Sequence, residues 1–306
     1  MNAIYFKSRG GPEALVYGPA ITAQAGEGEI VVRVRAAAVT PTELLWAPTW
    51  STRGGEPRPF PIIPGHEFSG EVHALGEGVN DTAVGQAVFG MNDWFQDGAQ
   101  AEFCVARTMD VAPRPASLDH VMASVVPISS LTAWQGLLER AKLGRGERVL
   151  VHGAAGNVGL FAVQIAHAIG AHVIGTASKR NLEFVRSLGA DEAIDYRAQS
   201  FDETVKGVDV VFDTVGGDTL TRSWNVLRPG GRTVTIAADA EHTSDQRVKD
   251  AFFVVEPNRE QLMQISQMID AGKLRVFVGG TFPLPEATQA YEHKPHRGKN
   301  VLVIDR

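Results

Sequence analysis

Residues 149–159 read Val-Leu-Val-His-Gly-Ala-Ala-Gly-Asn-Val-Gly, an apolar run that leads into three regularly spaced glycines. Gly153, Gly156 and Gly159 stand where a strand pattern gives way to a helical one. A tight turn needs residues without a Cβ, and the start of a helix offers unpaired N–H groups and a positive dipole. The stretch therefore predicts a strand, a turn and a helix whose first turn can hold phosphate groups.

The sequence that follows completes a β-α-β unit. Apolar residues recur on one helical face between positions 158 and 169, and Gly170 stands where a C-terminal cap belongs. Residues 171–177, Ala-His-Val-Ile-Gly-Thr-Ala, predict a second buried strand. A glycine-rich turn in another kind of α/β protein is the alternative, but the order strand, turn, helix, strand favours dinucleotide binding. The residues predicted to contact the cofactor here are Gly153, Ala155, Gly156, Asn157, Val158 and Gly159.

Length and composition exclude several classes of protein. The chain has 306 residues and a net charge of −6, without a basic face or a charged tail, so we expect neither nucleic acid nor membrane as a partner. No apolar run approaches the roughly 20 residues of a membrane span. The first residues predict a short strand rather than a signal peptide. Cys104 is the only cysteine, which suggests a core residue of a strand and a reducing, cytoplasmic location.

Two domains are expected from the distribution of strand and helix patterns. Residues 1–112 are β-rich, whereas residues 113–271 alternate helices with six strands, as in a doubly wound parallel sheet. Residues 299–304 predict a further strand that returns to the first domain. We therefore assign residues 1–112 and 272–306 to a β-rich substrate domain, interrupted by a dinucleotide-binding domain at 113–271.

The motifs together resemble the medium-chain dehydrogenase/reductase superfamily, in its zinc-free, quinone-oxidoreductase-like branch. The matching segments span nearly the full length: Ala-Ala-Ala-Val-Thr-Pro at 36–41, Gly-His-Glu-Phe-Ser-Gly at 65–70, Leu-Thr-Ala-Trp at 131–134, the glycine turn at 151–159, Phe-Asp-Thr-Val-Gly-Gly at 212–217 and Arg-Gly-Lys at 297–299. The resemblance implies a GroES-like β domain, a Rossmann domain and a cleft that holds the nicotinamide. It also implies a homodimer, which is common in this branch.

Further cofactor contacts follow from the resemblance alone. Thr40 and Thr132 could hydrogen-bond near the nicotinamide ribose or the substrate oxygen, although many relatives carry Asn where Thr40 stands. The other implied contacts are Val215, Phe253, Val254, Arg297 and Lys299. The two basic residues could instead be ordinary surface charges.

Gly-His-Glu at 65–67 matches a motif whose histidine binds catalytic zinc in zinc-dependent members of the family. Catalytic zinc needs three protein ligands and one open position. The segments that match the other two ligand positions, Val-Thr-Pro at 39–41 and Val-Pro-Ile-Ser-Ser at 126–130, contain no Cys, His or carboxylate. We therefore predict no metal, and a hydrogen-bonded polar pair in place of a weak or vestigial metal site.

Selection between NADPH and NADH depends on charge at the end of the second strand. A carboxylate about 20 residues after the glycine turn accepts from the ribose 2′-OH and repels a 2′-phosphate. Here residues 175–181 read Gly-Thr-Ala-Ser-Lys-Arg-Asn, without an acid. Ser178 can donate a hydroxyl, and Lys179 and Arg180 offer positive charge, unless they are ordinary solvated residues at a helix start. Tyr196 matches a tyrosine that contacts this phosphate in relatives, so we predict NADP(H) as the cofactor.

Without a metal, quinones and α,β-unsaturated carbonyls are better hydride acceptors than simple ketones, because conjugation delocalises the developing charge. Three of the five tryptophans lie in the first domain and could form an aromatic wall for a flat substrate, or could pack in its core. The candidate pocket residues are Glu43, Trp46, Trp50, His66 and Trp94. Glu43 could instead cap a helical turn, and no proton donor is assigned.

The sequence thus predicts an NADPH-dependent reductase of quinones or activated alkenes. Two alternatives stay open: an enoyl or alkenal reductase of a particular pathway, and an NADPH-binding redox sensor without turnover.

Overall fold

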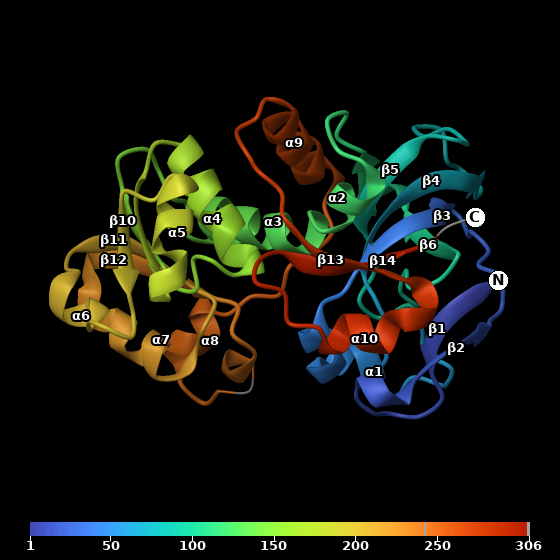
Figure 1. Cartoon of the computed structure of the whole chain (residues 1–306), viewed down its shortest axis with the longest axis horizontal. Coiled ribbons are helices and arrows are strands. Elements are labelled where there is room, and N and C mark those ends of the chain that lie inside the picture. Colours follow the sequence, from blue (N-terminus) through green and yellow to red (C-terminus); the bar gives the residue numbers. More distant parts are fainter. Residues whose placement is uncertain (242, 305–306) are drawn as a thin grey trace. The chain divides into compact units, whose positions relative to one another are not determined.

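The computed structural model describes residues 1–241 and 243–304 and divides into two compact units (Figure 1). Unit 1 comprises Met1–Ile128, Pro257–Gly272 and Val276–Arg306, and unit 2 comprises Ser129–Glu256 and Lys273–Arg275. Residues 113–128 and 257–271, which the sequence places in the second domain, therefore pack with unit 1, whereas residues 273–275, which the sequence places in the first domain, pack with unit 2.

Two sets of contacts explain why these segments join unit 1. Helix α2 (His120–Ser124) packs on strands of the β-rich sheet. Helix α9 (Arg259–Asp270) is held at both ends: the Arg259 guanidinium donates to the carbonyls of Thr108 and Val111, and the Asp270 carboxylate accepts from Ser117 N at 2.9 Å. These partners are remote in sequence, so local patterns could not reveal them.

Unit 1 is built on a seven-stranded sheet with the order β13-β14-β3-β4-β5-β7, in which β6 also pairs with β3. Its strands are β3 (Glu29–Ala38), β4 (Glu67–Leu75), β5 (Ala87–Met91), β6 (Phe103–Arg107), β7 (Val111–Pro113), β13 (Val278–Pro283) and β14 (Lys299–Val303). A separate hairpin joins β1 (Asn2–Phe6) and β2 (Leu15–Pro19). The predicted return of the chain's last strand is confirmed, because β14 pairs antiparallel with β3.

The β-rich sheet closes over an apolar core. Alternate residues of β3 point inward, and Ile30, Val32 and Val34 are fully buried beside Phe68 of β4. Short helices α1 (Ala47–Trp50) and α10 (Ala287–Glu292) complete the unit. Cys104 is buried on β6, as predicted for a core residue of a strand.

Unit 2 contains a five-stranded, all-parallel sheet with the order β10-β9-β8-β11-β12. Its strands are β8 (Arg148–Val151), β9 (His172–Ala177), β10 (Glu192–Asp195), β11 (Val208–Asp213) and β12 (Leu227–Thr235). Its helices are α4 (Asn157–Ala168), α5 (Leu182–Ser187), α6 (Phe201–Thr204), α7 (Gly217–Ser223) and α8 (Gln246–Ala251), and α3 (Pro127–Trp134) leads into the unit. Because the strand order reverses at β8, the sheet has a switch point between β8 and β11, where doubly wound proteins bind ligands.

The prediction of six strands is wrong by one. The predicted sixth strand, Ala-Phe-Phe-Val-Val at 251–255, forms only a single parallel bridge, between Phe252 and Thr235. Helix α8 ends at Ala251, so the first residue of this apolar segment is the last residue of a helix. An apolar run of that length cannot be distinguished from a buried helix end by its pattern.

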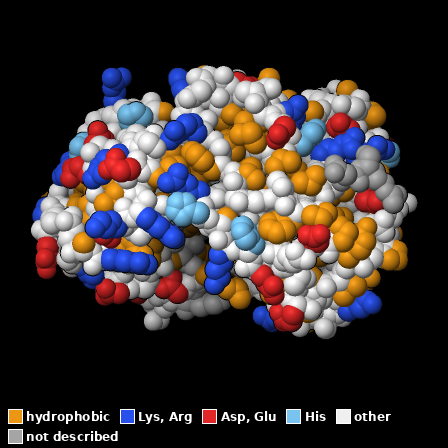
Figure 2. All heavy atoms as spheres, viewed as in Figure 1, with side chains coloured by type: hydrophobic (Ala, Val, Ile, Leu, Met, Phe, Trp, Pro, Cys, Tyr) orange, Lys and Arg blue, Asp and Glu red, His pale blue; other side chains and the backbone are white. Residues whose placement is uncertain are grey.

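No described helix is both long and apolar enough to cross a membrane. On the face shown in Figure 2, positive side chains over unit 2 are interspersed with acidic ones rather than forming one basic surface.

Candidate functional site

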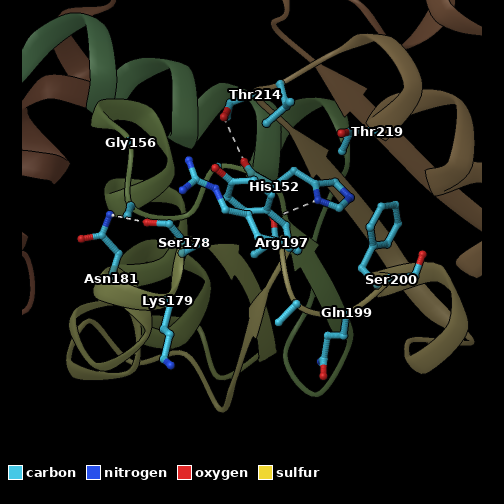
Figure 3. Close-up of a pocket in the computed structure, with 18 of the residues that line it drawn as sticks. His152, Gly156, Ser178, Lys179, Asn181, Arg197, Gln199, Ser200, Thr214 and Thr219 are labelled. Carbon is cyan, nitrogen blue, oxygen red and sulfur yellow. Dashed lines mark hydrogen bonds between the residues drawn. The ribbon is translucent and has the colours of Figure 1, made fainter.

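A cavity of about 1140 Å³ opens in unit 2 at the carboxyl ends of β8, β9, β10 and β11 (Figure 3). Its lining comes from the last residues of β9, from the loops that follow these strands, and from helices α6 and α7. The lining residues are His152, Gly153, Ala155, Gly156, Thr176, Ala177, Ser178, Lys179, Arg180, Asn181, Tyr196, Arg197, Ala198, Gln199, Ser200, Phe201, Thr214, Val215, Thr219 and Arg222. The cavity thus lies at the switch point of the sheet.

The glycine turn forms one wall of the cavity. Gly153 has φ of +68°, a backbone conformation that residues other than glycine rarely adopt. The Gly156 N–H donates a hydrogen bond to Gly153 O at 2.8 Å. Gly156 is the exposed N-cap of α4. A Cβ on Gly159 would overlap Gly153 O and lie 2.8 Å from Ala154 Cα. The turn therefore brings bare backbone and the start of α4 to the cavity, as phosphate binding requires.

A second turn, after β11, is fixed by a buried carboxylate. Asp213 accepts from Val215 N at 3.1 Å, from Gly216 N at 3.0 Å and from the Thr235 hydroxyl at 2.7 Å. Burial raises the pKa of Asp213, although these three donors oppose the rise. The Thr214 hydroxyl donates to His152 O at 2.9 Å and so ties this turn to the glycine turn.

His152 is a buried histidine at the base of the cavity. Its Nδ1 lies 3.0 Å from the Thr176 hydroxyl, its Nε2 lies 2.9 Å from the Ser223 hydroxyl, and its ring packs edge-on against Phe201. Burial lowers the pKa of His152 to about 3, so the ring is uncharged at neutral pH. The partners of His152 lie on β9 and α7, far along the chain, so the sequence pattern predicts no role for this residue.

Positive charge gathers where β9 and β10 end. Lys179 and Arg180 follow β9, and Arg197 follows β10 beside Tyr196, whereas the lining contains no Asp or Glu. A fourth cation, Arg222, is offset by Asp202, whose pKa it lowers. The cavity therefore suits an anionic group near the ends of these two strands.

The structure brings together part of the predicted cofactor site in this cavity: Gly153, Ala155, Gly156, Ser178, Lys179, Arg180, Tyr196 and Val215. Asn157, Val158 and Gly159 form the first turn of α4, outside the lining. Thr132 is buried on α3, Phe253 is buried, and Val254 is about half exposed. Thr40, Arg297 and Lys299 belong to unit 1.

Unit 1 holds a buried polar cluster around the Gly-His-Glu motif. Glu67 is fully buried, forms an ion pair with the Lys299 ammonium, and accepts from the Thr40 hydroxyl at 3.2 Å and from Ile128 N at 3.1 Å. Lys299, expected near the cofactor, thus has an internal partner. Glu43, expected to line a pocket or cap a helical turn, is fully buried and accepts from Gly65 N at 2.6 Å and from the Tyr291 hydroxyl at 3.3 Å.

The donors near His66 do not match a catalytic zinc site. Its Nδ1 lies 3.9 Å from Glu43 Oε2, and its Nε2 lies 3.4 Å from Gln96 O. Glu67 is already engaged by Lys299. Over residues 1–241 and 243–304, no group of three or more His, Cys, Asp or Glu side chains is arranged to hold a metal ion. The three-ligand set that catalytic zinc needs is therefore not assembled by the described residues.

The three tryptophans of the first domain fall into two groups. Trp50 packs edge-on against Phe6 in the core, and its indole N–H donates to Leu44 O at 2.8 Å. Trp46 and Trp94 form an edge-on pair with centroids 5.0 Å apart, and His66 lies 5.1 Å from Trp94. Trp50 therefore takes the core role, whereas Trp46, Trp94 and His66 form one aromatic cluster.

Two family models match the chain. Residues 26–116 match the alcohol dehydrogenase GroES-like domain, and residues 188–302 match the zinc-binding dehydrogenase family. The mitochondrial NAD(P)H oxidoreductase RTN4IP1 of Danio rerio is 31% identical, over 90% of this chain and 84% of the relative. The chain belongs to the medium-chain dehydrogenase/reductase superfamily, in its quinone-oxidoreductase-like branch.

Other members of the superfamily are similar to this chain over nearly its whole length. The 2-haloacrylate reductase of a Burkholderia species is 31% identical over 96% of this chain and 95% of its own. The solved structure of the quinone oxidoreductase from Coxiella burnetii superimposes with a TM-score of 0.89 at 30% identity, covering 100% of this chain and 99% of that one. Unit 1 is thus the GroES-like domain of a medium-chain reductase, unit 2 contains its Rossmann-like sheet, and the chain is an NAD(P)H-dependent oxidoreductase.

Proposed function

We propose that this chain uses NADPH to reduce quinones or activated alkenes, meaning α,β-unsaturated carbonyl compounds, without a metal ion. The observation that carries the proposal is the cavity at the ends of β9 and β10, which is rich in cations and has no carboxylate in its lining. A carboxylate at this place selects NADH, so its absence there together with Lys179 and Arg180 favours a 2′-phosphate.

The pyrophosphate and the 2′-phosphate of NADPH each have residues of this cavity suited to them. The turn at Gly153 and Gly156, with the N-terminus of α4, would hold the pyrophosphate by backbone N–H groups. Ser178, with Lys179, Arg180 and Tyr196, would hold the 2′-phosphate. When bound, NADPH supplies the hydride. We expect it to bind at least about tenfold more tightly than NADH, a difference of roughly 1.4 kcal/mol.

The remaining proposed contacts are not part of this cavity. Thr132, Phe253 and Val254 stay proposed contacts of the nicotinamide half, as the family resemblance implies. Thr40, Arg297 and Lys299 stay proposed on the same ground, although Thr40 and Lys299 also have the internal partner Glu67.

The proposal of metal-free chemistry rests on the residues around His66. The Lys299 ammonium already neutralises Glu67 in the buried cluster, and the ligand set for zinc is incomplete among the described residues. Without a Lewis acid, a simple ketone would develop an alkoxide charge with little stabilisation. A conjugated acceptor spreads that charge over its own π system, so orientation can supply much of the rate.

The substrate class is supported by the aromatic cluster and by the relatives. Trp46 is partly exposed and offers apolar ring surface to a flat conjugated molecule, and the buried rings of Trp94 and His66 pack in the same cluster. The names of the relatives, a quinone oxidoreductase and a 2-haloacrylate reductase, fit acceptors whose reacting carbon is electron-poor. A pathway-specific enoyl or alkenal reductase would use the same hydride geometry.

Assembly and location are proposed on more general grounds. We propose a homodimer, as is common in this branch, which light scattering of the purified protein would measure directly. The single buried cysteine fits a reducing compartment such as the cytoplasm, and the Danio rerio relative is named mitochondrial.

Oxidation of NADPH and NADH by a panel of quinones, enals, enones and simple ketones tests the proposal. We expect turnover with the conjugated acceptors, a kcat/KM at least about tenfold higher with NADPH, and no loss after dialysis against a metal chelator. Turnover of simple ketones that the chelator abolishes would contradict the metal-free chemistry. Tight NADPH binding with no turnover of any acceptor would favour the redox-sensor alternative.

A further inference from the structure

The loops after β9 and β10 face the same cavity from adjacent strands. These strands are parallel neighbours in which Ala177 pairs with Asp195, and Tyr196 N donates to Ala177 O at 3.3 Å. Ser178 and Lys179 therefore leave the sheet level with Tyr196 and Arg197. Figure 3 shows Ser178, Lys179 and Arg197 among the side chains around this cavity.

Five other arginines of unit 2 have acidic partners, whereas the cations of these two loops form no ion pair within the part of the chain that the structure describes. Arg186 pairs with Glu183, Arg228 pairs with Asp209, and Arg232 pairs with Glu147. In contrast, the structure gives no ion pair between Lys179, Arg180 or Arg197 and any residue of 1–241 or 243–304. Their charges are available to a ligand.

Arg197 is positioned by its own loop. The Asp195 carboxylate accepts from Arg197 N at 3.1 Å, which turns the chain directly after β10. The Arg197 guanidinium lies 5.5 Å from the centroid of the Tyr196 ring, a cation–π contact that leaves its N–H groups free for an anion. A guanidinium presents a planar fork that matches phosphate oxygens, and Arg197 supplies one beside the loop after β9.

We propose that Arg197 is a specificity-determining residue, which holds the 2′-phosphate of NADPH from the β10 side while Ser178, Lys179 and Arg180 hold it from the β9 side. This inference rests on the proposed use of NADPH. The charges of both loops would contact the same phosphate group. Removing the charge of one loop should therefore weaken the binding of NADPH, whereas the contacts that NADPH shares with NADH remain.

The test compares dissociation constants of NADPH and NADH, measured by fluorescence titration, for wild type and for Arg197→Gln. We expect the NADPH constant to rise about tenfold, as for loss of about 1.4 kcal/mol, and the NADH constant to stay within about twofold. Arg186→Gln is the matched control, because it removes the same charge from an exposed site outside the cavity lining. It should leave both constants unchanged.

A second variant separates a local role from general electrostatics. Lys179→Gln should also weaken NADPH selectively, and the double variant should lose less than the sum of the two single losses if both residues contact one phosphate group. An unchanged NADPH constant in Arg197→Gln, or an equal rise for NADPH and NADH, would overturn the assignment of Arg197.

The wild-type protein separates this failure from failure of the proposed function. Equal affinities of wild type for NADPH and NADH would refute the proposed cofactor preference itself. A wild-type preference for NADPH that survives Arg197→Gln would refute only the role of Arg197.

Discussion

At the scale of single residues, the role of a side chain depends on whether it is buried and on which residues it contacts there. Cys104 illustrates a role that the sequence predicted correctly: its strand context indicated a core residue, and burial on β6 raises the pKa of its thiol. Lys299 illustrates the opposite case. Its partner Glu67 is remote in sequence, so no local pattern could show that its ammonium is buried in an ion pair.

His152 leads to a prediction about pH. Its neutral ring is buried under the cavity, and burial lowers its pKa from the ordinary 6.5 to about 3. Below about pH 6.5 the unfolded chain therefore binds a proton that the folded chain does not. We expect the free energy of unfolding to fall as the pH is lowered towards about 3, with His152 contributing about 1.4 kcal/mol per pH unit.

Nuclear magnetic resonance of the histidine ring protons measures this directly, with His152→Gln identifying the signal. The His152 signal should stay that of a neutral ring from pH 8 down to pH 5, whereas in denaturant it should titrate near the ordinary value. A midpoint above about 6 in the folded protein would show that the ring is not sequestered as described.

At the scale of elements, the strand–turn–helix unit was predictable because its apolar, glycine and helical patterns are adjacent in sequence. Strand β9 lies within one residue of the segment predicted at 171–177, and β8 ends directly before the glycine turn, as predicted. The role of the loop after β10 could not be predicted from the sequence, because it depends on how β10 pairs with β9. Arg197 became a candidate only when the pairing of Ala177 with Asp195 placed it level with Lys179.

Two glycines of the glycine turn give a prediction in which one alanine variant serves as the control for the other. Gly159→Ala places a methyl group against Gly153 O and Ala154 Cα, both backbone atoms that cannot yield, whereas the nearest atom to a Cβ on Gly156 is Gly153 O at 3.2 Å. We expect Gly159→Ala to cost about 3 kcal/mol or more of stability. Gly156→Ala should cost less than about 1 kcal/mol but weaken NADPH binding, because its exposed backbone borders the phosphate site.

Urea unfolding and cofactor titration of both variants measure these two effects separately. Equal unfolding midpoints for the two variants would contradict the close approach of α4 to the glycine turn. Wild-type NADPH affinity in Gly156→Ala would contradict the placement of the pyrophosphate beside Gly156.

At the scale of the whole molecule, the sequence predicted a β-rich domain interrupted by a dinucleotide-binding one, and family membership followed from motifs spread over nearly all of the chain. The compact units differ from the predicted domain limits at 113–128, 257–271 and 273–275. Helix α9 is the clearest reason, since Arg259 and Asp270 bind carbonyls and amides of unit 1. The amphipathic pattern of a helix does not reveal which sheet it covers.

We propose that hydride passes from NADPH to the electron-poor carbon of a conjugated acceptor. Reduction of an enone with NADPH carrying deuterium at C4 of the nicotinamide, on each face in turn, tests it most directly by mass spectrometry of the product. We predict one deuterium at the β-carbon from one of the two labelled cofactors. Unlabelled NADPH in heavy water should place deuterium only at the α-carbon. A product without cofactor deuterium at the β-carbon from either labelled form would contradict the account.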